Sequence, residues 1–90
     1  MKQVVVFHKP FCFACDQLKE YLESRRIAYK AVNGQSAEGK TFMLTHEVFL
    51  AFYPGLCVDG RLYEYAHLFD ENGGILRDAL EEIFSVTSSD

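Results

Sequence analysis

The sequence has little cysteine, little proline and no long apolar run. Three cysteines in 90 residues exclude a secreted scaffold built from many disulfides. No apolar segment approaches the roughly 20 residues of a transmembrane helix, and no basic stretch precedes a long apolar one, so we expect neither a membrane span nor a signal peptide. Nine basic residues against thirteen acidic ones, a net charge of −4, argue against nucleic acid as a partner.

What remains is enough for one small domain. Hydrophobic residues make up 49% of the chain and aromatic residues 14%, which allows a packed core without stabilising disulfides. We see neither an internal repeat nor a linker, so the sequence predicts a single domain over residues 1–86 and a short loose tail over 87–90. We expect a monomer in the cytoplasm, which is the default compartment for a chain with few cysteines and no signal peptide.

The most informative motif is a pair of cysteines, Cys12 and Cys15, that follows an apolar run at residues 4–7 and opens a helical pattern. This spacing allows the two sulfurs to form a small disulfide ring. A helix N-terminus favours negative charge, so the first thiol should ionise readily, and the thiolate is the form that attacks disulfides. A C-x-x-C pair in a βαβ unit is typical of a thioredoxin-like redox motif, and the competing interpretation is two structural thiols.

The rest of the pattern predicts an α/β fold in the order β-α-β-α-β-β-α. Asp59-Gly60 between two β-rich runs predicts a hairpin, whereas the first two strands need a parallel crossover. The predicted elements are a strand at 3–7, a helix at 13–26, a strand at 27–32, one helix or two helical pieces within 36–52, strands at 56–58 and 62–65, and a helix over 75–84.

Two separated segments on this order of elements carry a resemblance to the glutaredoxins. Residues 8–15 resemble the active-site segment of that family, which often reads S-K-P-T-C-P-Y-C, with matches at Lys9, Pro10, Cys12 and Cys15. Residues 54–60 resemble its P-x-x-F-I-N-G segment, which begins at a cis-proline facing the active site. The resemblance covers about residues 3–84 and implies a thioredoxin-like (glutaredoxin) fold, with a four-stranded mixed sheet and helices on both faces.

The resemblance also implies a function and a set of site residues. The protein is expected to be a thiol–disulfide oxidoreductase that reduces protein or glutathione mixed disulfides. Cys12 is then the nucleophile and Cys15 resolves the mixed disulfide, while Lys9 contacts a carboxylate of glutathione or of the partner. A cis bond before Pro54 exposes the backbone of Tyr53, which pairs with the substrate like an added strand. No tightly bound cofactor is needed.

Departures from the family pattern concern glutathione. Glu64-Tyr65 stands where the family has two glycines that let the glutathione backbone approach closely. Bulk at these positions predicts weak binding of glutathione, which remains a candidate co-substrate. The electron donor is therefore either glutathione or a flavin disulfide reductase, and the partner that accepts the electrons is a disulfide-bearing protein.

An alternative function is a non-enzymatic carrier of an iron–sulfur cluster or a metal through Cys12. C-x-x-C is half of a zinc site, but the sequence supplies no second half, so we expect no intrinsic metal site. Phe13 replaces the usual proline after the first cysteine, and some glutaredoxins without that proline hold a cluster between two subunits. We expect Cys57 to pack in the core. Three phenylalanines favour core packing over a partner groove: Phe42, Phe49 and Phe52.

Overall fold

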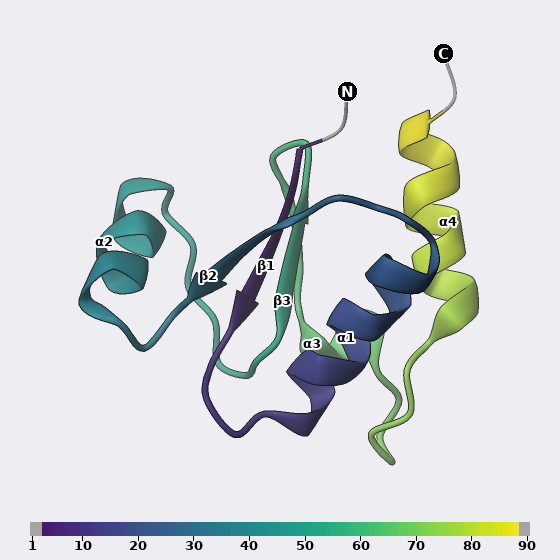
Figure 1. Cartoon of the computed structure of the whole chain (residues 1–90), viewed down its shortest axis with the longest axis horizontal. Helices are drawn as coiled ribbons and strands as arrows, with labels where there is room; N and C mark the ends of the chain where they lie inside the picture. The colour runs from purple at the N-terminus through teal and green to yellow at the C-terminus, as the bar shows by residue number, and fades with distance from the viewer. Residues whose placement is uncertain (1–2, 89–90) are drawn as a thin grey trace.

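The structure is a computed structural model that describes residues 3–88. These residues form four strands and four helices, and Figure 1 shows helices on both sides of the sheet. The elements are β1 (Val4–His8), α1 (Phe13–Ser24), β2 (Lys30–Asn33), α2 (Ala37–Thr45), β3 (Gly55–Val58), β4 (Arg61–Tyr63), α3 (Tyr65–Leu68) and α4 (Arg77–Ser88). No helix in this part of the chain is long and apolar enough to cross a membrane.

The sheet is mixed, in the order β2-β1-β3-β4. Strand β1 is parallel to β2 and antiparallel to β3, with Val6 paired to Ala31 on one side and to Leu56 on the other. β3 and β4 form the predicted hairpin, whose turn holds Asp59 and Gly60 at positive φ. An Asp-Gly pair at these angles makes the tight turn that matches strand twist, so this part of the prediction is confirmed.

Two apolar clusters pack on opposite faces of the sheet, as an α/β fold with helices on both faces requires. The larger cluster joins β1 and β3 to α1, α3 and α4, through residues such as Leu18, Leu68 and Leu80. The smaller one packs Met43 of α2 against Phe7 of β1. β1 is therefore buried on both faces, which explains why its sequence is almost entirely apolar instead of alternating.

The predicted start of the second strand is wrong because a local hydrogen bond extends the turn that precedes it. The second strand begins at Lys30 and not at residue 27, since the N–H of Ile27 still donates to the carbonyl of Leu22 at the end of α1 (2.9 Å). Of the two alternatives for residues 36–52, the single helix is confirmed: α2 lies within this range and ends at Thr45. There the chain turns so that the N–H of Val48 donates to the carbonyl of Met43 (2.8 Å).

The predicted strand at 62–65 is wrong in its second half. Glu64 is the N-cap of the short helix α3, and its N–H donates to Nδ1 of His67 (3.3 Å). This turn directs Leu68 and Phe69 into the larger cluster, where both are buried. The order of elements therefore gains one helix, β-α-β-α-β-β-α-α.

The last helix extends past residue 86, where the sequence predicted the tail to begin. α4 continues to Ser88. It therefore takes in residues 87 and 88, which the sequence assigned to a loose tail. Residues 89 and 90 lie outside the described part of the chain.

Candidate redox site

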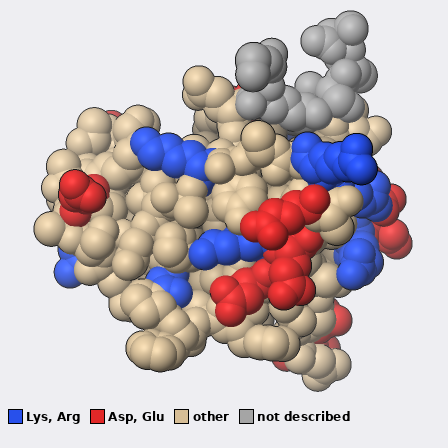
Figure 2. All heavy atoms as spheres, viewed as in Figure 1, with Lys and Arg blue, Asp and Glu red and all other residues tan. Residues whose placement is uncertain are grey.

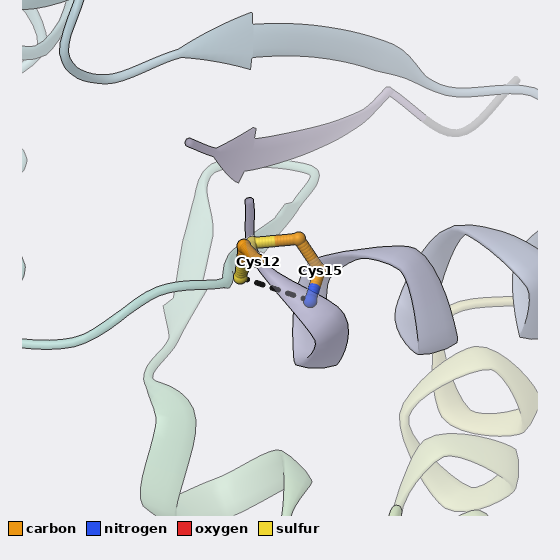
Figure 3. The surroundings of a disulfide bond; sticks show 2 residues. All are labelled: Cys12 and Cys15. Atoms are coloured by element: carbon orange, nitrogen blue, oxygen red, sulfur yellow. Dashed lines mark hydrogen bonds between the residues drawn. A yellow bond between two sulfur atoms is a disulfide. The ribbon is translucent and has the colours of Figure 1, made fainter. Parts of the chain in front are cut away.

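Cys12 and Cys15 form a disulfide at the N-terminus of α1, directly after the loop that follows β1. Cys12 is the N-cap residue, with an extended backbone (φ −120°, ψ 102°), and its Sγ accepts a hydrogen bond from the backbone N–H of Cys15 at 3.1 Å. Figure 3 shows this hydrogen bond beside the disulfide. A sulfur replaces the Ser, Thr or Asp oxygen that usually caps a helix. The helix therefore begins at the residue whose sulfur is the candidate reacting atom.

The two sulfurs differ in access. Cys15 is 1% exposed, whereas Cys12 is half-buried. Cys15 lies on the face of α1 that also carries Leu18 and Leu22 into the larger cluster. A molecule approaching from outside can therefore reach Cys12 but not Cys15.

The electrostatic surroundings favour a thiolate on Cys12 once the disulfide is reduced. The first N–H groups of a helix lack partners within it and carry partial positive charge. One of them already points at Sγ of Cys12. At the end of β1, burial lowers the pKa of His8, with Lys19 lowering it further and Asp16 opposing them. His8 is thus neutral at neutral pH, so the helix terminus supplies the stabilising field.

The third cysteine is a different kind of thiol. Cys57 is a half-buried free cysteine in β3, opposite Val5, and packs against the smaller cluster. Burial raises the pKa of the Cys57 thiol, and the backbone of Gly60 opposes this only in part. Cys57 therefore stays protonated at neutral pH and is a poor nucleophile.

We expect Cys12 to be the first thiol modified when the reduced protein meets iodoacetamide briefly at pH 7. Cys15 should resist because it is buried, and Cys57 should react only as the pH rises above the ordinary thiol range, since its pKa is raised. Peptide mapping by mass spectrometry locates the label. Early labelling of Cys57 or Cys15 would remove the basis for calling Cys12 the nucleophile.

The segment that enters β3 passes beside the cysteine loop in both Figure 1 and Figure 3. Its Tyr53–Pro54 bond is cis, as the sequence predicted, and Pro54 is buried. Lys9 is half-buried in the loop between β1 and Cys12. The structure thus brings the loop with Lys9 and the segment with Pro54 to the same end of the sheet.

The side chain of Tyr53 turns away from this site. Its hydroxyl donates to the sulfur of Met43 at 3.8 Å, and its ring packs in the smaller cluster. The ring also covers Gly34, where a Cβ would lie 2.6 Å from Cε1 and 2.7 Å from Cζ of Tyr53. Only the backbone of Tyr53 remains to meet a substrate, while its side chain anchors the segment to α2 and the end of β2.

Sequence reasoning missed the exposed aromatic side chains near the cysteines. Phe11 and Phe13, on either side of Cys12, are 106% and 76% exposed. Phe52 and Phe49 are also exposed, so the expectation that they pack in the core is wrong, and only Phe42 is half-buried. The sequence contained a signal for this exposure, because Phe11 and Phe13 flank the N-cap residue of α1 and lie outside the apolar stripe of that helix.

The structure gathers no three His, Cys, Asp or Glu side chains around a common metal position anywhere in residues 3–88.

Solved structures resemble this fold, although no family model and no curated protein matches the chain. A crystal structure of the thioredoxin-like protein BC3987 matches with a TM-score of 0.67 and 18% identity, over 90% of this chain and 99% of that one. A mutant of the same protein matches with a TM-score of 0.66 and 20% identity, over 96% and 99%. The chain therefore has a thioredoxin-like fold, with a C-x-x-C disulfide at the N-terminus of its first helix.

Proposed function

We propose that this protein is a thiol–disulfide oxidoreductase of glutaredoxin type that reduces disulfides on proteins. The observation that carries the proposal is the Cys12 sulfur, which caps α1, accepts the N–H of Cys15 at 3.1 Å and is linked to a buried partner sulfur. One sulfur is accessible, and in the reduced protein the helix N-terminus favours its thiolate form. The sulfur of Cys15 is buried and is placed to attack the sulfur of Cys12 from inside the protein.

The chemistry needs only the two cysteines and the substrate. In the reduced protein the thiolate of Cys12 attacks one sulfur of a substrate disulfide; a new S–S bond forms, and the other substrate sulfur leaves with the electron pair and takes a proton from water. Cys15, deprotonated in its turn, attacks Cys12, forms the disulfide seen in the structure and releases the second substrate thiolate, which is also protonated. Two electrons pass from the dithiol to the substrate.

Regeneration of the dithiol requires a donor, and we propose glutathione or a flavin disulfide reductase in the cytoplasm. Lys9 offers a positive charge near Cys12 for a carboxylate of glutathione. Tyr65 opposes the binding of glutathione, because it occupies a position where the family keeps glycine. Its ring stacks on that of Phe69, with the two centroids 4.9 Å apart. The arrangement favours a protein as the main substrate and glutathione as a slower partner.

A stoichiometric transfer tests this function. The reduced protein is mixed anaerobically with insulin, used as a disulfide-bearing probe, and thiols and disulfides are mapped by mass spectrometry. We expect two new insulin thiols for each Cys12–Cys15 disulfide formed. Intact insulin together with a persistent dithiol would overturn the proposal. A visible absorption band in anaerobically purified protein, combined with no transfer, would favour the cluster carrier.

A further inference from the structure

Two phenylalanines project into solvent on either side of the reactive cysteine. Phe11 is 106% exposed and Phe13 is 76% exposed, so neither ring contributes much to the core. Both are chain neighbours of Cys12, the sulfur that a substrate reaches first. Exposure of large apolar groups to water has a free-energy cost for the isolated protein. The two rings lie where a substrate must approach Cys12.

The backbone at Phe11 adds to this observation. Its φ of +55° lies in the left-handed region, which glycine and asparagine enter readily and bulky residues rarely do. Glycine or asparagine would meet the need of the turn with less strain. Because the ring of Phe11 packs against no other part of the domain, the fold gains nothing from it.

A third exposed ring lies on the neighbouring segment. Phe52, which is 70% exposed, stands two residues before Pro54 on the segment that passes beside the cysteine loop in Figures 1 and 3. Its ring centroid lies 6.2 Å from that of Tyr65, which in turn stacks on the buried Phe69. Phe52 is thus supported from the core, and we call Phe11, Phe13 and Phe52 the aromatic rim.

Lys9 is the charged residue of the loop from β1 to Cys12, and negative charge begins further along the chain, on α1. Figure 2 shows Asp and Glu side chains gathered over α1 and a mostly uncharged surface at the lower left edge, where the loop from β1 to α1 lies in Figure 1. The acidic residues of this helix are Asp16, Glu20 and Glu23. An approaching chain therefore meets rings first and negative charge only further along α1.

We propose that the aromatic rim binds the polypeptide on either side of the reacting cysteine of the substrate and prefers apolar side chains there. This inference rests on the proposed function. The attacked sulfur must reach Cys12, so whatever covers Phe11 and Phe13 during the reaction is the chain that carries that sulfur. Glutathione places carboxylates beside its cysteine, and covering them with rings removes their water without a partner.

Two peptides test the preference. Each carries one cysteine as a mixed disulfide with 2-mercaptoethanol; one has Leu, Phe and Val beside the cysteine, and the other has Ser, Asn and Gln. The rate at which the reduced protein releases the peptide thiol is measured below saturation, with bis(2-hydroxyethyl) disulfide as a reference substrate without flanking chain. We expect the apolar peptide to react about tenfold faster than the polar one, as the burial of one large apolar side chain allows.

The variant Phe11→Asn/Phe13→Ala removes two rings and keeps a residue suited to the left-handed turn. We expect it to lower the ratio of apolar-peptide rate to reference rate about tenfold. Leu44→Ala is the matched control, because Leu44 is also exposed (67%) but lies on α2, across the sheet. This control should leave the ratio unchanged.

Each result decides the inference. A wild-type preference below twofold overturns it, as does a double variant that keeps the preference or that loses the reference reaction to the same extent. A dimer in sedimentation that the double variant dissociates, without a peptide preference, would show that a second copy covers the rim and would overturn it too. If the wild type reduces none of the three substrates, the proposed function itself fails.

Discussion

Replacing Cys12 with serine is expected to abolish disulfide reduction, whereas replacing Cys15 is not. Serine at position 12 still caps α1, because its oxygen accepts an N–H as Sγ does, so the fold should survive while the nucleophile is lost. The measurement is release of thiols from insulin, with circular dichroism as a check on folding. We expect Cys12→Ser to fall to the rate of the uncatalysed reaction.

Cys15→Ser supplies the contrast. Cys12 can still attack, but the buried thiol that resolves the mixed disulfide is gone. We expect a stable adduct between Cys12 and the substrate, visible as an added mass, which glutathione then releases slowly. Cys57→Ser is the control that should keep normal transfer, since Cys57 lies in β3 and outside the disulfide. Activity retained by Cys12→Ser would contradict the mechanism.

A second large effect is expected at Gly39, where helix propensity and tertiary structure predict opposite signs. Alanine in place of glycine normally stabilises a helix by about 1 kcal/mol. In this fold a Cβ at position 39 would lie 2.6 Å from the carbonyl carbon of Asn33, and the carbonyl oxygen would clash as well. Since the obstacle is backbone, we expect Gly39→Ala to lower the free energy of unfolding by about 1–3 kcal/mol.

Hydrogen bonds hold that backbone in place. The carbonyl of Asn33 accepts the N–H of Ser36 at 3.1 Å and its hydroxyl at 2.8 Å, and Oγ of Ser36 accepts the N–H of Gly39 at 2.9 Å. Urea unfolding of the oxidised protein measures the change, with the exposed Lys40→Ala in the same helix as a control expected within about 0.5 kcal/mol of the wild type. A more stable Gly39→Ala would show that propensity outweighs the clash.

Local patterns alone were sufficient for several features. The apolar run of β1, the helix after Cys12 and the Asp59-Gly60 hairpin each depend on residues close together in the chain, and all three are present. The cysteine pair belongs with them, because a three-residue spacing at a helix start places both sulfurs within bonding reach. The thioredoxin-like fold was implied by the resemblance that the two motifs carry on these elements, and the solved structures confirm it.

Contacts between distant segments decided the rest. Glu64-Tyr65 has the alternation of a strand, yet burial of Leu68 in the larger cluster makes it the start of α3. Tyr53 precedes Pro54 in the sequence, but its ring packs over Gly34 and points away from the cysteines. Glycine is a poor helix former, yet Gly39 is the place where α2 passes the carbonyl of Asn33.

The sequence by itself determined the cysteine pair that forms the disulfide, and the tertiary structure decided which side chains are exposed. Two thiols at a helix N-terminus are a local arrangement, since the N–H of Cys15 and the sulfur of Cys12 are three residues apart. Exposure is a property of the whole packed chain. Phe11 and Phe52 are as apolar as Phe7, and only the packed core shows that Phe7 is buried while the other two are exposed to water.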